Sequence, residues 1–580
     1  MKVLKGIASS DGISYGICYI LDRTKVAVRK YTIAQNEIEP ETARLRRAVE
    51  KTAWFIQQSK NISKDSLSEE NSFIFDIYLM LLKDTMLTGE AEKLIANKLI
   101  NAEYALETAC NGLVERFRMS ENEYLRERKT DVINVVQKVL RFMTGGGPDS
   151  ILKVEDAEII IAHDLTPADT SHMKKNNIRG FATDLGSKTS HTSILARSLG
   201  IPAVVGLVDI AKVAQTGDFV IIDGFEGQVI INPDDETLET YKLKGSRYTD
   251  YVCELGQMRG ESSVTKDGVE IKLFSNVEMN DELEKANEYK SDGVGLYRTE
   301  YIYMQHGDVD EETQFNILKD AAELNYGRPL TIRTFDLGSD KLSKYMPHPK
   351  EHNPAMGLRA VRYSLKYEEF FMKQLRAVLR VSAFANVKLM FPMISGLEEL
   401  RACKIALNEA KRQLKTENIA FNENIKVGVM MELPSLAVIS EMAAPEVDFF
   451  SVGTNDLIQY ALGIDRNNEF VAYLYEPCHP AVRALLKKIV ESAQSTGIEC
   501  TVCGEMAGEP KYIPLLIGMG YRQLSMSPSS ILRARMIIRS LKVSDCEELV
   551  KDLTSCAYSQ DAENRLMEFI RNKSTDVYFH

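Results

Sequence analysis

Hydrophobic and polar positions follow different rhythms along the 580-residue chain. Residues 1 to about 25 alternate in the manner of short β-strands. From about 35 to 143 the pattern changes to Glu, Lys, Leu and Ala at helical spacing, with almost no glycine or proline. This stretch predicts long amphipathic helices that pack as a bundle.

Strand patterns return after the glycine-rich break that follows residue 144. They are AEIIIAHDL, IRGFATDL, AVVG and the hairpin-like DFVIIDGFEGQVIINP. The economical interpretation is one α/β domain built from residues 1–25 and 144–232, which a helical domain of residues 26–143 interrupts. Residues 233–262 are charged and lack a strand pattern, so we expect a linker helix there.

The remaining residues, 263–580, repeat a strand-then-helix rhythm. Eight short strand-like runs occur there: VEIKLFSNV, GVGLYRTE, LTIRTFDLG, VKLMFPM, KVGVMME, DFFSVGTND, IECTVCGE and YRQLSMS. Eight strand–helix units in a segment of this length predict a (β/α)₈ barrel.

Reactive side chains stand at the ends of several of these runs, and the carboxyl ends of barrel strands meet at one face. The residues concerned are Arg298, Arg333, Glu432, Asn455, Asp456 and Cys503. Together with Arg466, the arginines could bind phosphate and carboxylate oxygens in bidentate fashion. Glu432 and Asp456 offer the hard oxygen ligands that Mg²⁺ prefers, and a thiol can exchange a proton with a substrate.

The segment TSHTSILARSLG, residues 189–200, places His191 in the first turn of a predicted helix that stops at Gly200. Backbone N–H groups and the helix dipole at such a position favour a neutral imidazole and a bound dianion. This environment suits a histidine that accepts a phosphoryl group. The local pattern alone also fits a capping-region histidine without chemistry.

Composition narrows the classes of function. The net charge of −12 argues against a sequence-nonspecific nucleic-acid binder. Nine scattered cysteines fit a reducing compartment, and the CxxC spacing of Cys500 and Cys503 is interpreted as incidental because no second ligand pair accompanies it. Without a signal-peptide core or a membrane-length apolar run, we expect a cytoplasmic protein that does not enter the membrane.

Long motifs in a fixed order carry a resemblance that covers essentially the whole chain. They are TSHTSILARSLGIPAVVG, GVGLYRTE, RTFDLGSDK, NPAMGLRAVR, MFPMI, GVMMELP, VDFFSVGTNDLIQY and CGEMAG. The chain resembles enzyme I of the bacterial phosphotransferase system, the phosphoenolpyruvate–protein phosphotransferases. This resemblance implies an α/β multidomain fold: a swivelling phosphohistidine α/β domain with an inserted helical bundle, then a C-terminal (β/α)₈ barrel.

The resemblance also implies a role for each matching residue. His191 is the expected phosphorylated residue, Cys503 the proton donor to the enolate, and Mg²⁺ the metal at Glu432 and Asp456. The expected substrate-binding residues are Arg298, Arg333, Lys341, Arg359, Asn455, Asp456 and Arg466. Expected partners are phosphoenolpyruvate, with pyruvate as its product, a small phosphocarrier protein of the HPr type, and a second copy of the chain through the barrel.

Four positions depart from the family pattern, and none removes a nucleophile, metal ligand or clamping arginine: Ser187, Lys188, Ser339 and Ile458. The segment FDIYLMLLKDTML resembles the carrier-docking region but is less acidic at Thr85 and Met86, while Glu69 and Glu70 remain acidic candidates for a basic partner.

Two other functions are left open. One is a relative of pyruvate phosphate dikinase or phosphoenolpyruvate synthase. Two observations argue against it: only 190 residues precede His191, and they contain no glycine-rich phosphate loop. The other is a catalytically weakened regulatory scaffold, supported only by Ser187, Lys188 and Ser339.

Overall fold

The computed structural model divides the chain into two compact units, residues 1–250 and 251–579. It describes residues 1–21, 28–63, 78–118, 129–144, 158–165, 178–186, 193, 196, 200–338, 351–466, 468 and 470–573. Within these residues, every helix is too short or too polar to cross a membrane.

The first unit contains an eight-stranded mixed sheet whose strands come from two separate stretches of the chain. Its order is β1-β8-β7-β3-β4-β5-β6-β2. The strands are β1 (Lys2–Lys5), β2 (Ile7–Ser10), β3 (Ile13–Leu21), β4 (Ile159–Ala162), β5 (Gly180–Thr183), β6 (Ala203–Val205), β7 (Phe219–Asp223) and β8 (Gln228–Ile231). β3, β4, β5 and β6 run parallel, and β4 is buried along its whole length because apolar clusters cover both faces of the sheet.

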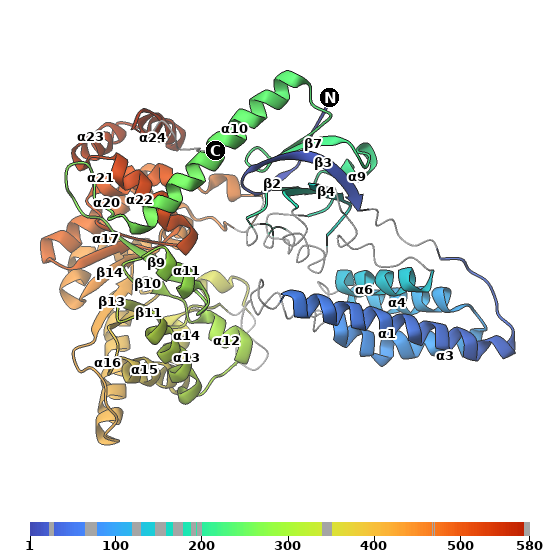
Figure 1. The fold of residues 1–580 in the computed structure, drawn as a ribbon. Coiled ribbons are helices and arrows are strands. Elements are labelled where there is room, and N and C mark those ends of the chain that lie inside the picture. The colour runs from blue at the N-terminus through green and yellow to red at the C-terminus, as the bar shows by residue number, and fades with distance from the viewer. Residues whose placement is uncertain are drawn as a thin grey trace. The chain divides into compact units, whose positions relative to one another are not determined.

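Helices occupy the chain between β3 and β4. They are α1 (Ile38–Ser63), a π-helical turn (Thr85–Gly89), α3 (Glu90–Lys98), α4 (Ala102–Arg118) and α6 (Lys129–Met143). They pack side by side (Figure 1) around one apolar core that includes Leu45, Ile95, Leu106 and Val136. The predicted helical bundle between two pieces of an α/β domain is therefore confirmed, whereas the boundaries at residues 144, 233 and 263 stay predictions. A long helix, α10 (Asp235–Gln257), connects the two units.

The second unit contains a closed barrel of eight parallel strands, which confirms the predicted (β/α)₈ barrel. The strands are β9 (Lys272–Val277), β10 (Val294–Tyr297), β11 (Leu330–Arg333), β12 (Val387–Phe391), β13 (Lys426–Met430), β14 (Phe449–Val452), β15 (Glu499–Val502) and β16 (Gln523–Met526). Each strand lies within one of the eight runs expected from the sequence.

Helices follow these strands and form the outer layer. They are α11 (Glu282–Glu288), α12 (Glu300–His306), α13 (Glu311–Leu324), α14 (Val361–Lys366), α15 (Glu368–Val381), α16 (Leu397–Thr416), α17 (Pro434–Val438), α18 (Ser440–Ala443), α19 (Thr454–Leu462), α20 (Pro480–Thr496), α21 (Ile513–Met519), α22 (Ile531–Ser540), α23 (Val543–Leu553) and α24 (Ser559–Lys573).

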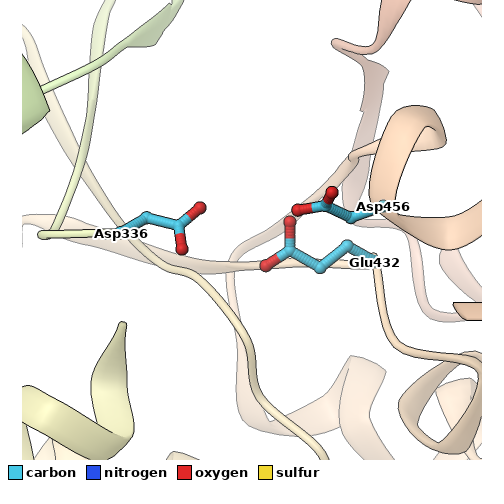
Figure 2. A group of neighbouring side chains, drawn as sticks. All are labelled: Asp336, Glu432 and Asp456. Atoms are coloured by element: carbon cyan, nitrogen blue, oxygen red, sulfur yellow. The ribbon is translucent and has the colours of Figure 1, made fainter. Parts of the chain in front are cut away.

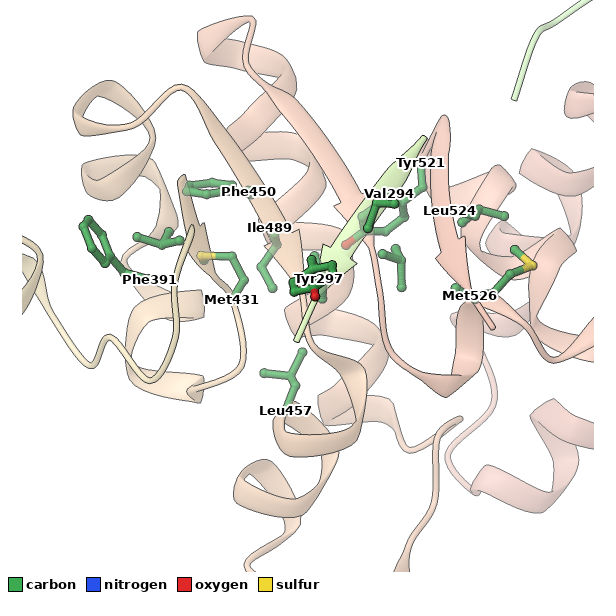
Figure 3. Packing of buried hydrophobic residues seen from close by; sticks show 14 of the residues in the cluster. Val294, Tyr297, Phe391, Met431, Phe450, Leu457, Ile489, Tyr521, Leu524 and Met526 are labelled. Atoms are coloured by element: carbon green, nitrogen blue, oxygen red, sulfur yellow. The ribbon is translucent and has the colours of Figure 1, made fainter. Parts of the chain in front are cut away.

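The side chains along each barrel strand point alternately into two apolar layers. Phe391, Met431 and Phe450 point to the large cluster between strands and helices (Figure 3). A separate small cluster consists of Leu296, Met390, Met430, Phe449 and Cys503. Because side chains alternate along a strand, the two layers are the outer and inner faces of the barrel wall.

Candidate active site at the carboxyl face of the barrel

Strand alternation explains why polar residues enter the barrel mouth. Leu296 and Met430 belong to the inner cluster, so the residues two positions later, Arg298 and Glu432, leave the wall on the same side. Ile332 packs in the outer layer, so the adjacent Arg333 points inward. An arginine, a glutamate and a second arginine from three strands therefore meet at one face.

Arg333 and Arg359 form the centre of a buried ionic network. Arg333 contacts Asp336 at 2.8 Å and Glu300 at 3.0 Å. Arg359 contacts Asp336 at 2.8 Å and Asp456 at 2.9 Å. Each guanidinium thus bridges two carboxylates, and Asp336 is the acid that both arginines share. Arg359 holds Asp336 through two hydrogen bonds, and contacts with two acids fix each arginine in place.

Three carboxylates converge beside these arginines. The ligand oxygens of Asp336, Glu432 and Asp456 lie within 4.8 Å of one another, and Figure 2 shows the carboxylates turned toward a common space. The Met393 backbone N–H donates a 2.5 Å hydrogen bond to Glu432 Oε1 from a residue in the left-handed region at φ 55°. The strained backbone at Met393 therefore helps to hold a carboxylate of the cluster.

The carboxylates in this network have opposite electrostatic environments. Burial, with the nearby charges of Asp336 and Asp456, raises the pKa of Glu432 to about 8. Burial opposes ionisation of Asp336 too, but Arg333 and Arg359 overcome it and lower the pKa of Asp336 to about 2. Asp336 is therefore an anion held in ion pairs, whereas the ionised form of Glu432 would be stabilised by an additional cation.

A cavity of about 280 Å³ adjoins the network and is lined by Cys503, Arg298 and Asn455 among others. Cys503 Sγ lies 3.4 Å from Val452 O and 3.5 Å from Met430 Sδ. Burial raises the pKa of the thiol to about 12, so at neutral pH it carries its proton. Cys500, three residues earlier, packs against the outer cluster, so the two thiols face opposite sides of β15.

A second polar group lies at the wall of this cavity. Asn455 Nδ2 donates to Glu505 Oε1 at 2.9 Å, and the Glu505 backbone N–H donates to Asn455 Oδ1 at 2.8 Å. Arg466 reaches the same Glu505 carboxylate at 3.6 Å. The close approach of residue 504 to Thr454 requires a glycine, because a Cβ atom at position 504 would lie 1.9 Å from Thr454 Oγ1.

The structure thus brings together, at one face, most of the site residues expected from the sequence. Arg333, Arg359, Glu432 and Asp456 form one cluster; Arg298, Asn455 and Cys503 line the adjoining cavity; and Arg466 joins through Glu505. This placement does not establish their roles, which stay predictions. His191 and Lys341 lie outside the described residues, as do Ser187, Lys188, Ser339, Glu69 and Glu70.

Of the helix predicted over residues 189–200, the structure describes Ser193, Ala196 and Gly200. The Ile201 N–H donates to Ala196 O at 3.1 Å, and Gly200 has φ 65°. These are features of a Schellman cap, so the predicted helix stop at Gly200 is confirmed. Of the four unusual positions, Ile458 is described, and it is fully buried in the outer layer of the barrel.

Three contributors were missed by sequence reasoning. Asp336 and Glu300 are the acids that hold Arg333, and both stand within three residues of a predicted strand-end arginine. Their positions after strand ends were the available signal. The Met393 backbone contact has no residue-type signal, because any non-proline residue provides an N–H.

Comparison with known proteins agrees with this architecture. Family models described as "PEP-utilising enzyme, PEP-binding domain", "PEP-utilising enzyme, N-terminal" and "PEP-utilising enzyme, mobile domain" match residues 253–543, 5–128 and 154–227. A protein of Priestia megaterium named phosphoenolpyruvate-protein phosphotransferase is 38% identical over 98% of this chain and 99% of its own length. A protein of the same name from Geobacillus stearothermophilus is 40% identical over 97% of both chains. Another, from Listeria monocytogenes, is 39% identical over 99% of this chain and 100% of its own.

Proposed function

Since the chain belongs to the phosphoenolpyruvate-protein phosphotransferase family and transfers a phosphoryl group from phosphoenolpyruvate to protein, we propose that its own His191 is the first acceptor. From His191 the phosphoryl group passes to a histidine of a small phosphocarrier protein of the HPr type. The chain acts as a homodimer through the barrel. Near-complete mutual coverage with relatives of this name favours this function over a dikinase or synthase.

The observation that carries the proposal is the meeting of guanidinium groups, carboxylates and a protonated thiol at the barrel face. Phosphoryl transfer needs mainly positioning and neutralisation of charge. Arg333 and Arg359 supply fixed positive charge, and Arg333 Nε is buried without a hydrogen-bond partner among the described residues. That donor is free for an oxygen of an anionic substrate. Arg298, Lys341, Asn455, Asp456 and Arg466 complete the substrate contacts.

The three-carboxylate cluster fits a magnesium ion. Glu432 and Asp456 would hold Mg²⁺, and Asp336 lies close enough to support them. A cation there would offset the burial and the repulsion from Asp336 and Asp456 that together raise the pKa of Glu432. When bound, Mg²⁺ would neutralise charge on the phosphoryl oxygens.

Cys503 then provides the proton for the departing group. His191 attacks phosphorus, the bond from phosphorus to the enol oxygen breaks, and the electron pair remains on the enolate of pyruvate. The Cys503 thiol donates its proton to the enolate carbon, pyruvate leaves, and solvent returns a proton to the sulfur. A raised thiol pKa keeps this donor loaded at neutral pH.

Labelling tests the proposal directly. The protein is incubated with phosphoryl-labelled phosphoenolpyruvate and Mg²⁺, and we expect acid-labile label on His191. His191→Ala should abolish the label, and His163→Ala, which removes another histidine of the same α/β sheet domain, should not. An unlabelled wild-type protein would overturn the proposal, and label from ATP without phosphoenolpyruvate would revive the dikinase alternative.

A further inference from the structure

Glu278 and Arg298 are neighbours because β9 and β10 end in register. Val277 pairs with Tyr297 at the ends of the two parallel strands. The Arg298 backbone N–H donates to Val277 O at 2.9 Å. The next side chains, Glu278 and Arg298, therefore leave the same edge together, and the Glu278 carboxylate accepts a hydrogen bond from the Arg298 guanidinium.

This pair lies within the cavity that contains Cys503. Both residues line it, and both side chains are partly exposed, Arg298 at 38% and Glu278 at 51%. Arg333 and Arg359 each bind two buried carboxylates, whereas Glu278 is the sole acid in ion-pair contact with Arg298 among the described residues. Among Arg298, Arg333 and Arg359, Arg298 thus has the most accessible anionic partner.

We propose that Glu278 occupies the place of substrate oxygens on Arg298, so that phosphoenolpyruvate must displace an internal carboxylate in order to bind. Glu278 is then an affinity-determining residue that weakens substrate binding. This inference rests on the proposed function, because it takes Arg298 to be a ligand of the substrate.

The size of the effect follows from the exposure of the pair. Partly exposed ion pairs contribute from almost nothing to about 1 kcal/mol, which corresponds to a factor of up to about five in an equilibrium constant. Repulsion between the Glu278 carboxylate and an anionic substrate acts in the same direction. Both effects are screened by salt.

The test measures the dissociation constant of phosphoenolpyruvate with Mg²⁺ by calorimetry in a His191→Ala background, in which the substrate is not consumed. We expect Glu278→Gln to lower this constant about three-fold at low salt, and Glu278→Ala to lower it at least as much. Half-molar salt should shrink the difference. Glu509→Gln is the matched control, because Glu509 is also an acid of the cavity wall and, in the part of the chain that the structure describes, forms no ion pair with an arginine of the site.

The possible outcomes distinguish the role of Glu278 from the role of Arg298 in substrate binding. Weaker binding in Glu278→Gln would mean that Glu278 holds Arg298 ready for substrate, and an equal gain in Glu509→Gln would mean that only total charge matters; either overturns the inference. An unchanged constant in Glu278→Gln, with weaker binding in Arg298→Met, overturns the inference alone. No effect of Arg298→Met would instead remove Arg298 from the proposed substrate site.

Discussion

The same barrel carries two ionic networks, one at each end of its strands. At the carboxyl face, Arg333 and Arg359 meet the carboxylates of Asp336, Glu432 and Asp456. At the amino ends, Glu499 of β15 pairs with Lys388 of β12 at 2.5 Å and with Lys426 of β13 at 3.0 Å.

The two networks differ in how well their charges are matched. Burial opposes ionisation of Glu499, yet the two lysines lower its pKa to about 2, so this carboxylate is fully paired. Glu432 is driven the other way, to a pKa of about 8. Paired charges stabilise the fold, whereas a buried carboxylate with a raised pKa favours the binding of a cation. The contrast supports the proposed site at the carboxyl ends of the barrel strands.

Replacing Glu432 should give the largest effect and should separate activity from stability. We expect Glu432→Gln to slow phosphoenolpyruvate-dependent labelling about 1,000-fold, since charge neutralisation by a bound cation is worth several kcal/mol. The free energy of unfolding should not fall, because glutamine keeps the acceptor for the Met393 N–H and removes a carboxyl group whose ionisation burial and two neighbouring carboxylates oppose. Urea unfolding alongside the labelling assay measures both, and a loss of stability equal to that of a core truncation would contradict this account.

The two cysteines of β15 allow a comparison within one strand. We expect Cys503→Ala to slow pyruvate release about 100-fold, the usual contribution of a positioned proton donor, while phosphoryl exchange with a phosphorylated carrier survives. Cys500→Ala is the control, because Cys500 packs on the outer side of the wall. Equal loss in both variants would assign the effect to packing.

The sequence predicts the barrel and the convergence of its strand-end residues because both follow from local periodicity. Arg333 ends β11 and Glu432 follows β13, so alternation directs both to the mouth, and Asp456 follows in the first turn of α19, the helix after β14. The sequence does not predict that Asp336 links Arg333 to Arg359, since that contact depends on the path of the chain between β11 and α14. The balance of charge that sets Glu432 apart from Glu499 is also a property of three-dimensional neighbours and burial.

Neutralising the matched network should affect stability alone. Glu499→Gln leaves Lys388, which is largely buried, without its charged partner. We expect the free energy of unfolding to fall by about 1–2 kcal/mol, while labelling stays within about two-fold of wild type. Glu423→Gln is the control, because its pair with Lys415 is well exposed and should contribute less than about 0.5 kcal/mol.

The smallest expected effect is the pH dependence of that same stabilisation. The pKa of Glu499 is lowered from 4.5 to about 2 in the folded chain, so the native state favours the ionised carboxylate. Its contribution is therefore complete above about pH 5 and is lost as the pH falls from there toward 2. Urea unfolding of wild type and Glu499→Gln at pH 6, 5 and 4 should show the difference narrowing by a few tenths of a kcal/mol, since solvent screens a partly exposed group. A difference that widens as the pH falls would mean that Glu499 is not the matched anion of this cluster, and the contrast between the two ends of the barrel would fail with it.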